Sequence, residues 1–421
     1  MTRATLGPID TLRRSAWLHR ERIVAWGTIL FALETLFLVF LACWQHGVFS
    51  RAEAATSSDF VSFYAAGKLV LAGTPALAYD QSAHYLAEQA ARGPSAPYQF
   101  FFYPPVYLLL CAVLATLPYY VAYALLEIGT LLPFIFVMRS ITQQQGWGWL
   151  GPLLAFPAVF WTIGLGQNAF LTAALLGGFT LLVDRRPRTA GMLLGLLCYK
   201  PHFGLLVPIA LLAGRRWLVF MATGATAVVL VGLSVALFGV ETWRAYLAAF
   251  AGSQSVYATG RIDYAGIITP FGAARLIGAL PDAANAVQAV ATVAMAVLVG
   301  WIWHRNRGGQ AVCSAVLLSA TLLAVPLALV YDQLLLLVAM GWLLRAAGNG
   351  GFRPWEKIAL ASIYPLSLLT WPIGSGFQVP LGPLGTAVIL VLCARRAGSA
   401  PTASQAGATQ AGATQAEGAT P

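Results

Sequence analysis

The chain has 421 residues, of which 59% are hydrophobic and only 10% are charged. Soluble domains carry about 25% charged residues, so this composition excludes an ordinary soluble enzyme and indicates a polytopic membrane protein. The net charge of +10 does not indicate nucleic-acid binding, because the arginines cluster beside apolar runs, as in the cytoplasmic segments of membrane proteins. The excess of positive charge therefore indicates which segments face the cytoplasm. The partners that this charge would attract are membrane lipids.

The first apolar run, from Ile23 to Trp44, is long enough to span a bilayer and is followed by no small-residue cleavage site. We interpret it as a retained helix, which places residues 1–22 in the cytoplasm. The longest polar interval, residues 45–104, comes next. It lacks the basic excess of a cytoplasmic loop, so we expect it to lie outside.

Within that interval, residues 57–68 have the sequence Ser-Ser-Asp-Phe-Val-Ser-Phe-Tyr-Ala-Ala-Gly-Lys and predict a short amphipathic helix. Ser57 or Ser58 is placed to cap its N-terminus, and Gly73 to end it. The aromatic residues recur on one side, whereas Asp59 falls on a small, polar side. Because the helix dipole favours an ionised carboxylate in the first turn, we expect Asp59 to accept a proton or a cation. The alternative is that Asp59 only helps to cap the helix.

The rest of the chain alternates apolar runs with short polar turns. The runs lie near residues 23–44, 105–118, 120–138, 148–164, 168–183, 189–213, 216–238, 283–303, 310–330, 333–346, 355–371 and 380–394. They predict about twelve transmembrane helices with both termini in the cytoplasm, in a membrane domain of residues 23–396 with a second outer loop at about 239–282. Residues 397–421 form a low-complexity tail that repeats Gln-Ala-Gly-Ala-Thr, for which we expect disorder.

The twelve-helix count conflicts with the distribution of charge. It places the basic cluster from Asp184 to Arg188 outside, against the positive-inside tendency, and it places Gly166-Gln167-Asn168 on the cytoplasmic side, away from Asp59. The alternative is that the basic cluster is cytoplasmic and that the neighbouring runs include a hairpin broken at Lys200-Pro201. The sequence leaves both topologies open.

Few polar groups lie within the apolar runs, and such groups mark function by default. Lys200-Pro201-His202 lies near the middle of one run, where the proline breaks the backbone ladder and both basic side chains are suited to an anion. The alternative is a lysine that reaches the interface from a shorter helix. We interpret Gly166-Gln167-Asn168 as a tight turn. Tyr103 belongs to an aromatic segment that would anchor the start of a helix at the membrane interface, and Asp332 is a charge at the start of a helix.

Soluble-enzyme signatures are absent from the sequence. The five cysteines are scattered singly and have neither metal nor redox spacing. There is no Gly-rich phosphate loop, no Gly-x-Ser-x-Gly, no His-Glu-x-x-His and no Asp-x-Asp pair. We therefore expect a membrane-borne substrate, no nucleotide-sugar or ATP substrate, and no cofactor.

Taken in order, the polar motifs resemble glycosyltransferase family 87, whose members are polytopic enzymes of the GT-C superfamily that includes mannosyltransferases using polyprenyl-phosphate-mannose. The resemblance extends over about residues 20–395. It rests on Asp59-Phe-x-x-Phe-Tyr-Ala-Ala-Gly-Lys, Leu71-x-Gly73, Ala78-Tyr79-Asp80, Phe102-Tyr103-Pro104-Pro105, Gly166-Gln167-Asn168, Ala190-Gly191-x-x-x-Gly195, Lys200-Pro201, Arg216-Trp217 and Tyr331-Asp332.

The resemblance implies an all-α GT-C fold with amphipathic juxtamembrane helices in the first outer loop. It implies a polyprenyl-phosphate-linked sugar donor, with mannose as the family's default, and an extracytoplasmic lipid or glycan acceptor. It also implies a bacterial inner-membrane location and an acidic catalytic base on the first juxtamembrane helix, here Asp59. Direct displacement would invert the anomeric carbon. The rival interpretation is a transporter or flippase for a lipid-linked sugar.

The resemblance further implies where the substrates bind. The leaving phosphate needs positive charge, for which Lys200 and His202 are the first candidates and Arg261 follows. No divalent metal is required, because side chains can neutralise a monophosphate. The remaining motif positions are carried over as substrate-binding candidates: Tyr64, Asp80, Tyr103, Gln167, Asn168 and Asp332.

Overall fold

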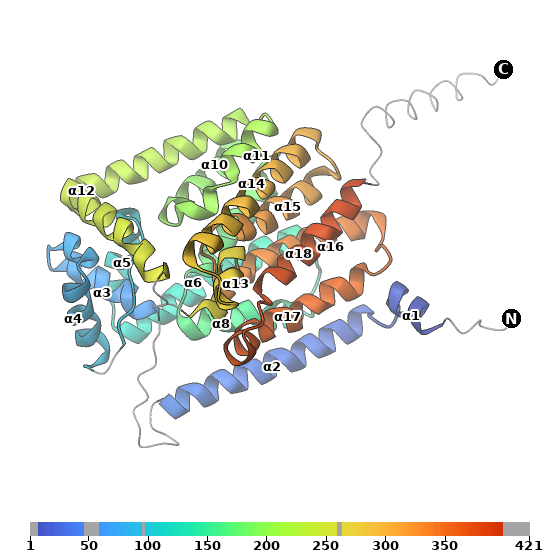
Figure 1. Cartoon of the computed structure of the whole chain (residues 1–421), viewed down its shortest axis with the longest axis horizontal. Helices are drawn as coiled ribbons and strands as arrows, with labels where there is room; N and C mark the ends of the chain where they lie inside the picture. The colour runs from blue at the N-terminus through green and yellow to red at the C-terminus, as the bar shows by residue number, and fades with distance from the viewer. Residues whose placement is uncertain (1–6, 46–58, 95–96, 259–262, 399–421) are drawn as a thin grey trace.

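The computed structural model describes residues 7–45, 59–94, 97–258 and 263–398, and in these ranges every regular element is helical (Figure 1). The α-helices are α1 (Pro8–Arg14), α2 (Arg20–Gln45), α3 (Phe60–Leu71), α4 (Gln81–Arg92), α5 (Leu108–Ala115), α6 (Tyr119–Thr142), α7 (Leu150–Leu154), α8 (Pro157–Leu165), α9 (Ala169–Leu182), α10 (Pro187–Leu196), α11 (Val207–Ala213), α12 (Trp217–Ala258), α13 (Pro270–Leu276), α14 (Pro281–Arg305), α15 (Gly309–Ala324), α16 (Leu334–Gly350), α17 (Glu356–Phe377) and α18 (Gly382–Gly398). The 3₁₀ turns are η1 (Pro75–Tyr79), η2 (Pro105–Tyr107), η3 (Leu197–Tyr199), η4 (Pro201–Gly204), η5 (Tyr264–Gly266) and η6 (Val330–Gln333).

The protein is a multi-pass membrane protein. Within the described ranges, six helices are long and apolar enough to cross a bilayer, so the expected twelve spans are not confirmed. Helix α9 has 14 residues and α10 has 10. At about 1.5 Å per residue, neither reaches across the hydrocarbon layer of about 30 Å. These shorter helices can lie at membrane depth only where longer neighbours shield their ends.

The α9–α10 turn settles the topological conflict. Asp184 in this turn forms an ion pair with Arg216 at the start of α12, at 2.5 Å. The same turn lines a cavity with Arg345 and Arg396, which follow or end apolar runs that the twelve-helix count directs into the cytoplasm. The basic cluster from Asp184 to Arg188 therefore lies at the end of the molecule that carries those arginines. The twelve-helix count placed the basic cluster and those arginines on opposite sides of the membrane, and this part of the count is wrong.

The apolar run at residues 189–213 is correspondingly a hairpin and not one span. Helix α10 ends at Leu196, and Lys200 has a non-helical backbone (φ −126°, ψ 66°) immediately before Pro201, which opens η4. Because proline removes a backbone donor and restricts the residue before it, the helix breaks here. Gly191 packs so closely on α12 that an added Cβ would come within 2.5 Å of the Ala222 side chain. This close approach holds the hairpin against α12.

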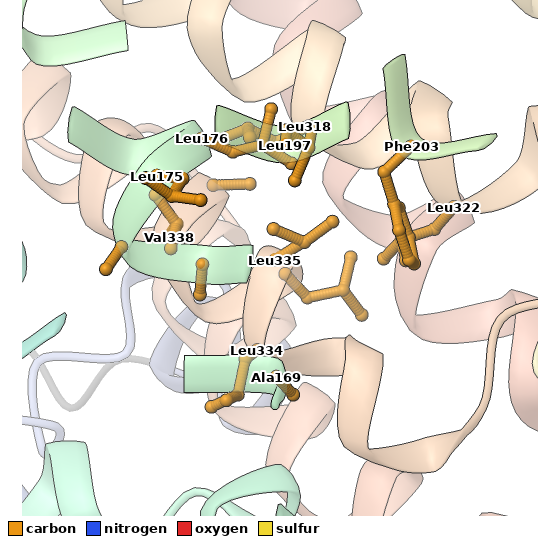
Figure 2. Close-up of a cluster of buried hydrophobic side chains, with 14 of the residues drawn as sticks. Ala169, Leu175, Leu176, Leu197, Phe203, Leu318, Leu322, Leu334, Leu335 and Val338 are labelled. Atoms are coloured by element: carbon orange, nitrogen blue, oxygen red, sulfur yellow. The ribbon is translucent and has the colours of Figure 1, made fainter. Parts of the chain in front are cut away.

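A hydrophobic core fixes the tip of that hairpin. Leu197 and Phe203 flank the break and are buried among residues of α9, α15 and α16 (Figure 2). Leu334 and Leu335, at the start of α16, belong to the same core. Packed interiors tolerate little displacement, so this core holds Lys200 and the residues before α16 in fixed relative positions.

Helices α3, α4 and α5 gather at one end of the molecule, opposite the end that carries α1 and the C-terminal part of α18 (Figure 1). Helix α3 ends at Leu71, and Gly73 follows with a φ of +77°, so the predicted end is confirmed. The expected caps, Ser57 and Ser58, lie outside the described residues. The aromatic face of α3 is buried against the protein: Phe60 and Phe63 are enclosed by tyrosines and by α5.

Candidate active site

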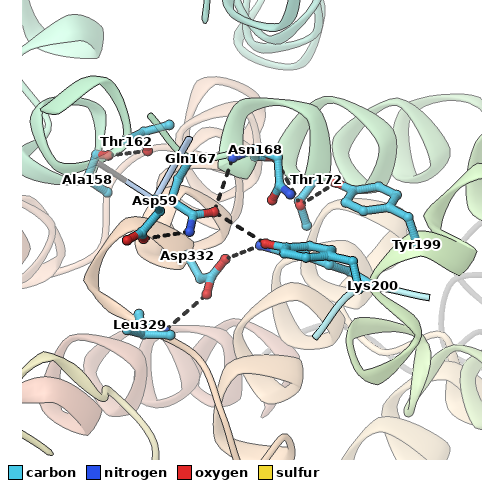
Figure 3. Close-up of polar contacts among 11 residues, drawn as sticks. Asp59, Ala158, Thr162, Gln167, Asn168, Thr172, Tyr199, Lys200, Leu329 and Asp332 are labelled. Atoms are coloured by element: carbon cyan, nitrogen blue, oxygen red, sulfur yellow. Dashed lines mark hydrogen bonds and ion pairs between the residues drawn. The ribbon is translucent and has the colours of Figure 1, made fainter. Parts of the chain in front are cut away.

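Asp59 precedes α3 and lies outside the membrane-spanning segments. Its side chain makes no capping hydrogen bond to α3. Instead, Gln167 donates a hydrogen bond through Nε2 to Oδ2 of Asp59, at 2.7 Å (Figure 3). Burial raises the pKa of Asp59 to about 6, while the Gln167 hydrogen bond and the charge of Lys200 oppose the rise. The carboxylate is therefore mainly ionised at pH 7 and still basic enough to accept a proton.

The turn after α8 aims Gln167 at Asp59. Gly166 caps α8 in the left-handed conformation (φ +69°), and both Gly166 N–H and Gln167 N–H donate to the carbonyl of Thr162. Tyr103 donates its hydroxyl to Oε1 of Gln167 at 3.4 Å, which orients the amide so that its N–H₂ faces Asp59. Gly166-Gln167-Asn168 thus lies beside Asp59, and the topology that separated them is wrong.

Lys200 and Asp332 form a buried ion pair in the same region. Lys200 Nζ lies 3.2 Å from Oδ1 of Asp332, and both side chains are about 5% exposed or less. The other carboxylate oxygen of Asp332 accepts the N–H of Leu329 at 3.0 Å. Lys200 Nζ also lies over the ring of Tyr331, at 5.4 Å. The break in the hairpin and the turn before α16 thus bring a cation next to Asp59 (Figure 3).

A stack of tyrosines lines this network. The ring of Tyr107 lies 4.5 Å from that of Tyr103 and 5.2 Å from that of Tyr199. Tyr199 shares a 2.7 Å hydrogen bond with Thr172. The fully buried amide of Asn168 lies beside the hydroxyls of Tyr103 and Tyr107, yet it forms no side-chain hydrogen bond of standard geometry with the described residues. Buried polar atoms without partners are candidates for contact with a substrate or a water molecule.

Sequence reasoning missed Tyr107 and Tyr199 at this site. The available signal was the four-residue spacing from Tyr103 to Tyr107 across a helix entry, together with the position of Tyr199 directly before Lys200.

The other predicted site residues lie elsewhere. Tyr64 donates its hydroxyl to the carbonyl of Leu117 at 2.9 Å, and Asp80 caps α4 by accepting the N–H of Ala83 at 2.8 Å. His202 is partly exposed with its ring on Phe203, and within the described ranges it has no hydrogen bond to the Asp59 network. Arg261 lies outside the described residues.

A buried histidine–glutamate pair on α4 also went unpredicted. His84 and Glu88 are completely buried, with Nδ1 and Oε1 3.5 Å apart. His84 donates through Nε2 to the carbonyl of Ser62 on α3, and Glu88 accepts the N–H of Gln99 at 3.0 Å. Burial lowers the pKa of His84 to about 4 and raises that of Glu88 to about 8, so both are mainly neutral at pH 7. The pair joins α3, α4 and the segment leading to Tyr103.

Within the described ranges, no group of three or more His, Cys, Asp or Glu side chains could hold a metal ion. The fold and the site together define a membrane protein in which the carboxylate of Asp59 lies near a buried ion pair of Lys200 and Asp332. The sequence profile of glycosyltransferase family 87 matches residues 101–328, more than half of the chain. The chain belongs to glycosyltransferase family 87 and is a membrane glycosyltransferase.

Comparisons with curated proteins and with solved structures gave no match. The predicted resemblance is thus confirmed at the level of the family. The matched range includes Tyr103, Gln167 and Lys200, whereas Asp59 and Asp332 lie outside it. The roles of these two carboxylates therefore rest on their geometry.

Proposed function

We propose that this protein transfers a sugar, with mannose as the leading candidate, from a polyprenyl-phosphate donor to a hydroxyl of a lipid or glycan acceptor. One observation carries the proposal: the carboxylate of Asp59 is held by Gln167 and lies near the buried Lys200–Asp332 pair. This arrangement supplies a base for the acceptor hydroxyl and a cation for the leaving phosphate at one place.

The reaction is a single displacement. Asp59 takes the proton from the acceptor hydroxyl as the oxygen attacks the anomeric carbon. The bond between that carbon and the phosphate oxygen breaks, and its electron pair leaves with polyprenyl phosphate, so the anomeric configuration inverts. A base with a pKa of about 6 suits this step near neutral pH, because it is ionised before reaction and can still hold a proton during it.

Lys200 is the main group proposed to stabilise the leaving phosphate. An ammonium group has three donors, and the contact with Asp332 uses one of them. A cation already held beside the base stabilises developing negative charge without moving. His202, the next residue but one, remains a second candidate, and Arg261 a third. Tyr103 and Asn168 are proposed to contact the donor sugar through their buried polar atoms.

The distribution of charge supports an extracytoplasmic site. The cavity lined by Arg185, Arg345 and Arg396 lies at the C-terminal ends of α9 and α16, whereas the Asp59 network includes Gln167 before α9 and Asp332 before α16. By the positive-inside rule that basic end faces the cytoplasm. We therefore place the Asp59 end outside the bacterial inner membrane, where lipid-linked sugars meet their acceptors.

The test compares the full chain with Asp59→Asn in proteoliposomes, using a panel of radiolabelled polyprenyl-phosphate sugars. Release of polyprenyl phosphate is measured with candidate acceptors, or as slow hydrolysis. Asp282→Asn is the matched control, since it removes an exposed carboxylate from the first turn of α14. We expect Asp59→Asn to bind donor but lose turnover and the control to keep it, and the sugar that reacts names the donor.

Two outcomes count against the proposal. Equal turnover by wild type and Asp59→Asn would remove Asp59 as the base. Movement of the donor across the bilayer, with no release of polyprenyl phosphate by any variant, would support the transporter or flippase instead.

A further inference from the structure

A cavity of about 550 Å³ lies at the basic end of the molecule, apart from the Asp59 site. It is bounded by the α9–α10 turn, the start of α15, the end of α16 and the end of α18. We call it the arginine pocket. Its charged and amide-bearing lining residues are Asp184, Arg185, Gln310, Arg345, Asn349, Arg353 and Arg396.

The carboxylates around the arginine pocket are already paired. Asp184 is engaged by Arg216, which lies outside the lining, at 2.5 Å. Arg396 makes two hydrogen bonds to Glu356, at 2.5 and 2.6 Å. Asp184 therefore does not neutralise Arg185 or Arg345, two further arginines of the lining.

Arg185 and Arg345 both line the arginine pocket, and neither forms an ion pair with a carboxylate of the described residues. Arg345 stacks over Trp342 and contacts the carbonyls of Ser140 and Ile141 only at 3.4 and 3.5 Å. The side chain of Arg185 has no hydrogen bond or ion pair with any described residue. Burial and the neighbouring charges of Arg396 and Arg395 lower the pKa of Arg353, while the charge of Glu356 opposes the change.

The first turn of α15 adds backbone donors to the arginine pocket. Gln310 and Ala311 line the cavity, and the N-cap, Gly308, has no side chain to satisfy their N–H groups, whereas the N–H of Gly309 donates to the carbonyl of Asn306. Gly308 has a φ of +80°, and an added Cβ would meet Val312 at 2.6 Å, so a capping serine or aspartate is excluded there. The helix dipole reinforces the attraction for negative charge.

We propose that the arginine pocket binds the phosphate headgroup of an anionic phospholipid from the leaflet at this end of the protein. A free phosphate ion offers the same chemistry but would fill little of the cavity. The apolar part of the lining, which includes Leu181, Val312 and Trp342, suits the glycerol and the first carbons of the acyl chains. Basic pockets between membrane helices are known to hold such headgroups.

The experiment measures lipid binding by native mass spectrometry and the melting temperature of the full chain in a neutral detergent. Phosphatidylglycerol, phosphatidylcholine and inorganic phosphate are added separately. We expect phosphatidylglycerol to bind and stabilise, and Arg185→Gln and Arg345→Gln each to weaken its binding about tenfold. Arg244→Gln, at an exposed arginine outside the pocket, is the control and should bind as wild type does.

Three results would overturn the proposal. Equal stabilisation by phosphatidylcholine would show that negative charge is not selected. Stabilisation by inorganic phosphate without lipid binding would identify a free-ion site. Unchanged binding in Arg185→Gln would exclude the pocket, and this result is interpretable even if Arg345→Gln fails to fold, because Arg185 is exposed.

Discussion

Replacing Gln167 with leucine tests the geometry at Asp59 most directly. The hydrogen bond from Nε2 to the carboxylate, 2.7 Å long, stabilises the ionised form. A hydrogen bond to a charged group contributes about 1.5–3 kcal/mol, and each pKa unit corresponds to about 1.4 kcal/mol. Gln167→Leu should therefore raise the pKa of Asp59 by about one to two units, from about 6 to about 7–8.

The sign of the effect on turnover follows from the proposed role of Asp59 as a base. Only the ionised carboxylate accepts a proton, so activity falls as the pH drops through its pKa. At pH 7, about 90% of Asp59 is ionised in the wild type, against about 10–50% in Gln167→Leu. The acid limb of kcat/KM should move to higher pH, and activity should recover in alkaline buffer.

The assay is the pH profile of polyprenyl-phosphate release in proteoliposomes between pH 5 and 9. Gln81→Leu makes the same chemical change at an exposed position at the start of α4 and should leave the acid limb in place. An unchanged limb in Gln167→Leu, with activity reduced equally at every pH, would refute the reasoning, since Gln167 would then not control the pKa of Asp59.

Three further predictions concern stability, measured as the melting temperature and the free energy of unfolding in detergent. Lys200→Met leaves Asp332 buried without its cation and should cost about 3–5 kcal/mol, whereas Lys200→Met combined with Asp332→Leu should cost less. Glu88→Ala leaves buried polar groups unpaired and should cost about 1–3 kcal/mol, whereas Glu88→Gln keeps donors and acceptors in place and should melt near wild type. Gly67→Ala should cost about 1–3 kcal/mol, because its Cβ would overlap the Cys111 carbonyl on α5.

Each of these predictions has a defined contrary result. If the double variant of Lys200 and Asp332 melts lower than Lys200→Met, the two charges do not act as a pair. If Glu88→Gln is as unstable as Glu88→Ala, the ionised carboxylate is required. Gly129→Ala, at an open position on α6, is the control for Gly67→Ala, and equal melting of the two variants would show that α3 and α5 can separate without cost.

The sequence supports the identity of the main site residues better than their arrangement. Gln167, Lys200 and Asp332 were recognisable as candidates because each interrupts or borders an apolar run, where polar groups are costly. Asp59 was recognisable because it lies at the start of an amphipathic helix in the polar interval. Their convergence was not predictable. The run at 189–213 has the length of one span, and membrane helices tolerate proline, so hydropathy alone cannot separate a kinked span from a hairpin.

The pair on α4 was unpredictable for a different reason. His84 and Glu88 lie four residues apart on a polar segment, a pattern that usually marks a solvated helix face. Their burial depends on the packing of α3 and of the segment around Gln99 over that face, and these contacts are distant in the sequence. The local sequence pattern of α4 therefore does not indicate that other segments bury this face of the helix.

The short helices of the broken hairpin also bear on how the chain enters the bilayer during synthesis. Helices α10 and α11 have 10 and 7 residues, so each is far too short to be inserted as an independent transmembrane segment. We therefore expect α10 and α11 to insert only together with a longer helix. The next long helix to be synthesised is α12, which packs on α10. Lys200 would then reach membrane depth only after α12 is in place. Substitutions at the Gly191 contact should therefore reduce the yield of inserted protein even when they lie far from the chemistry.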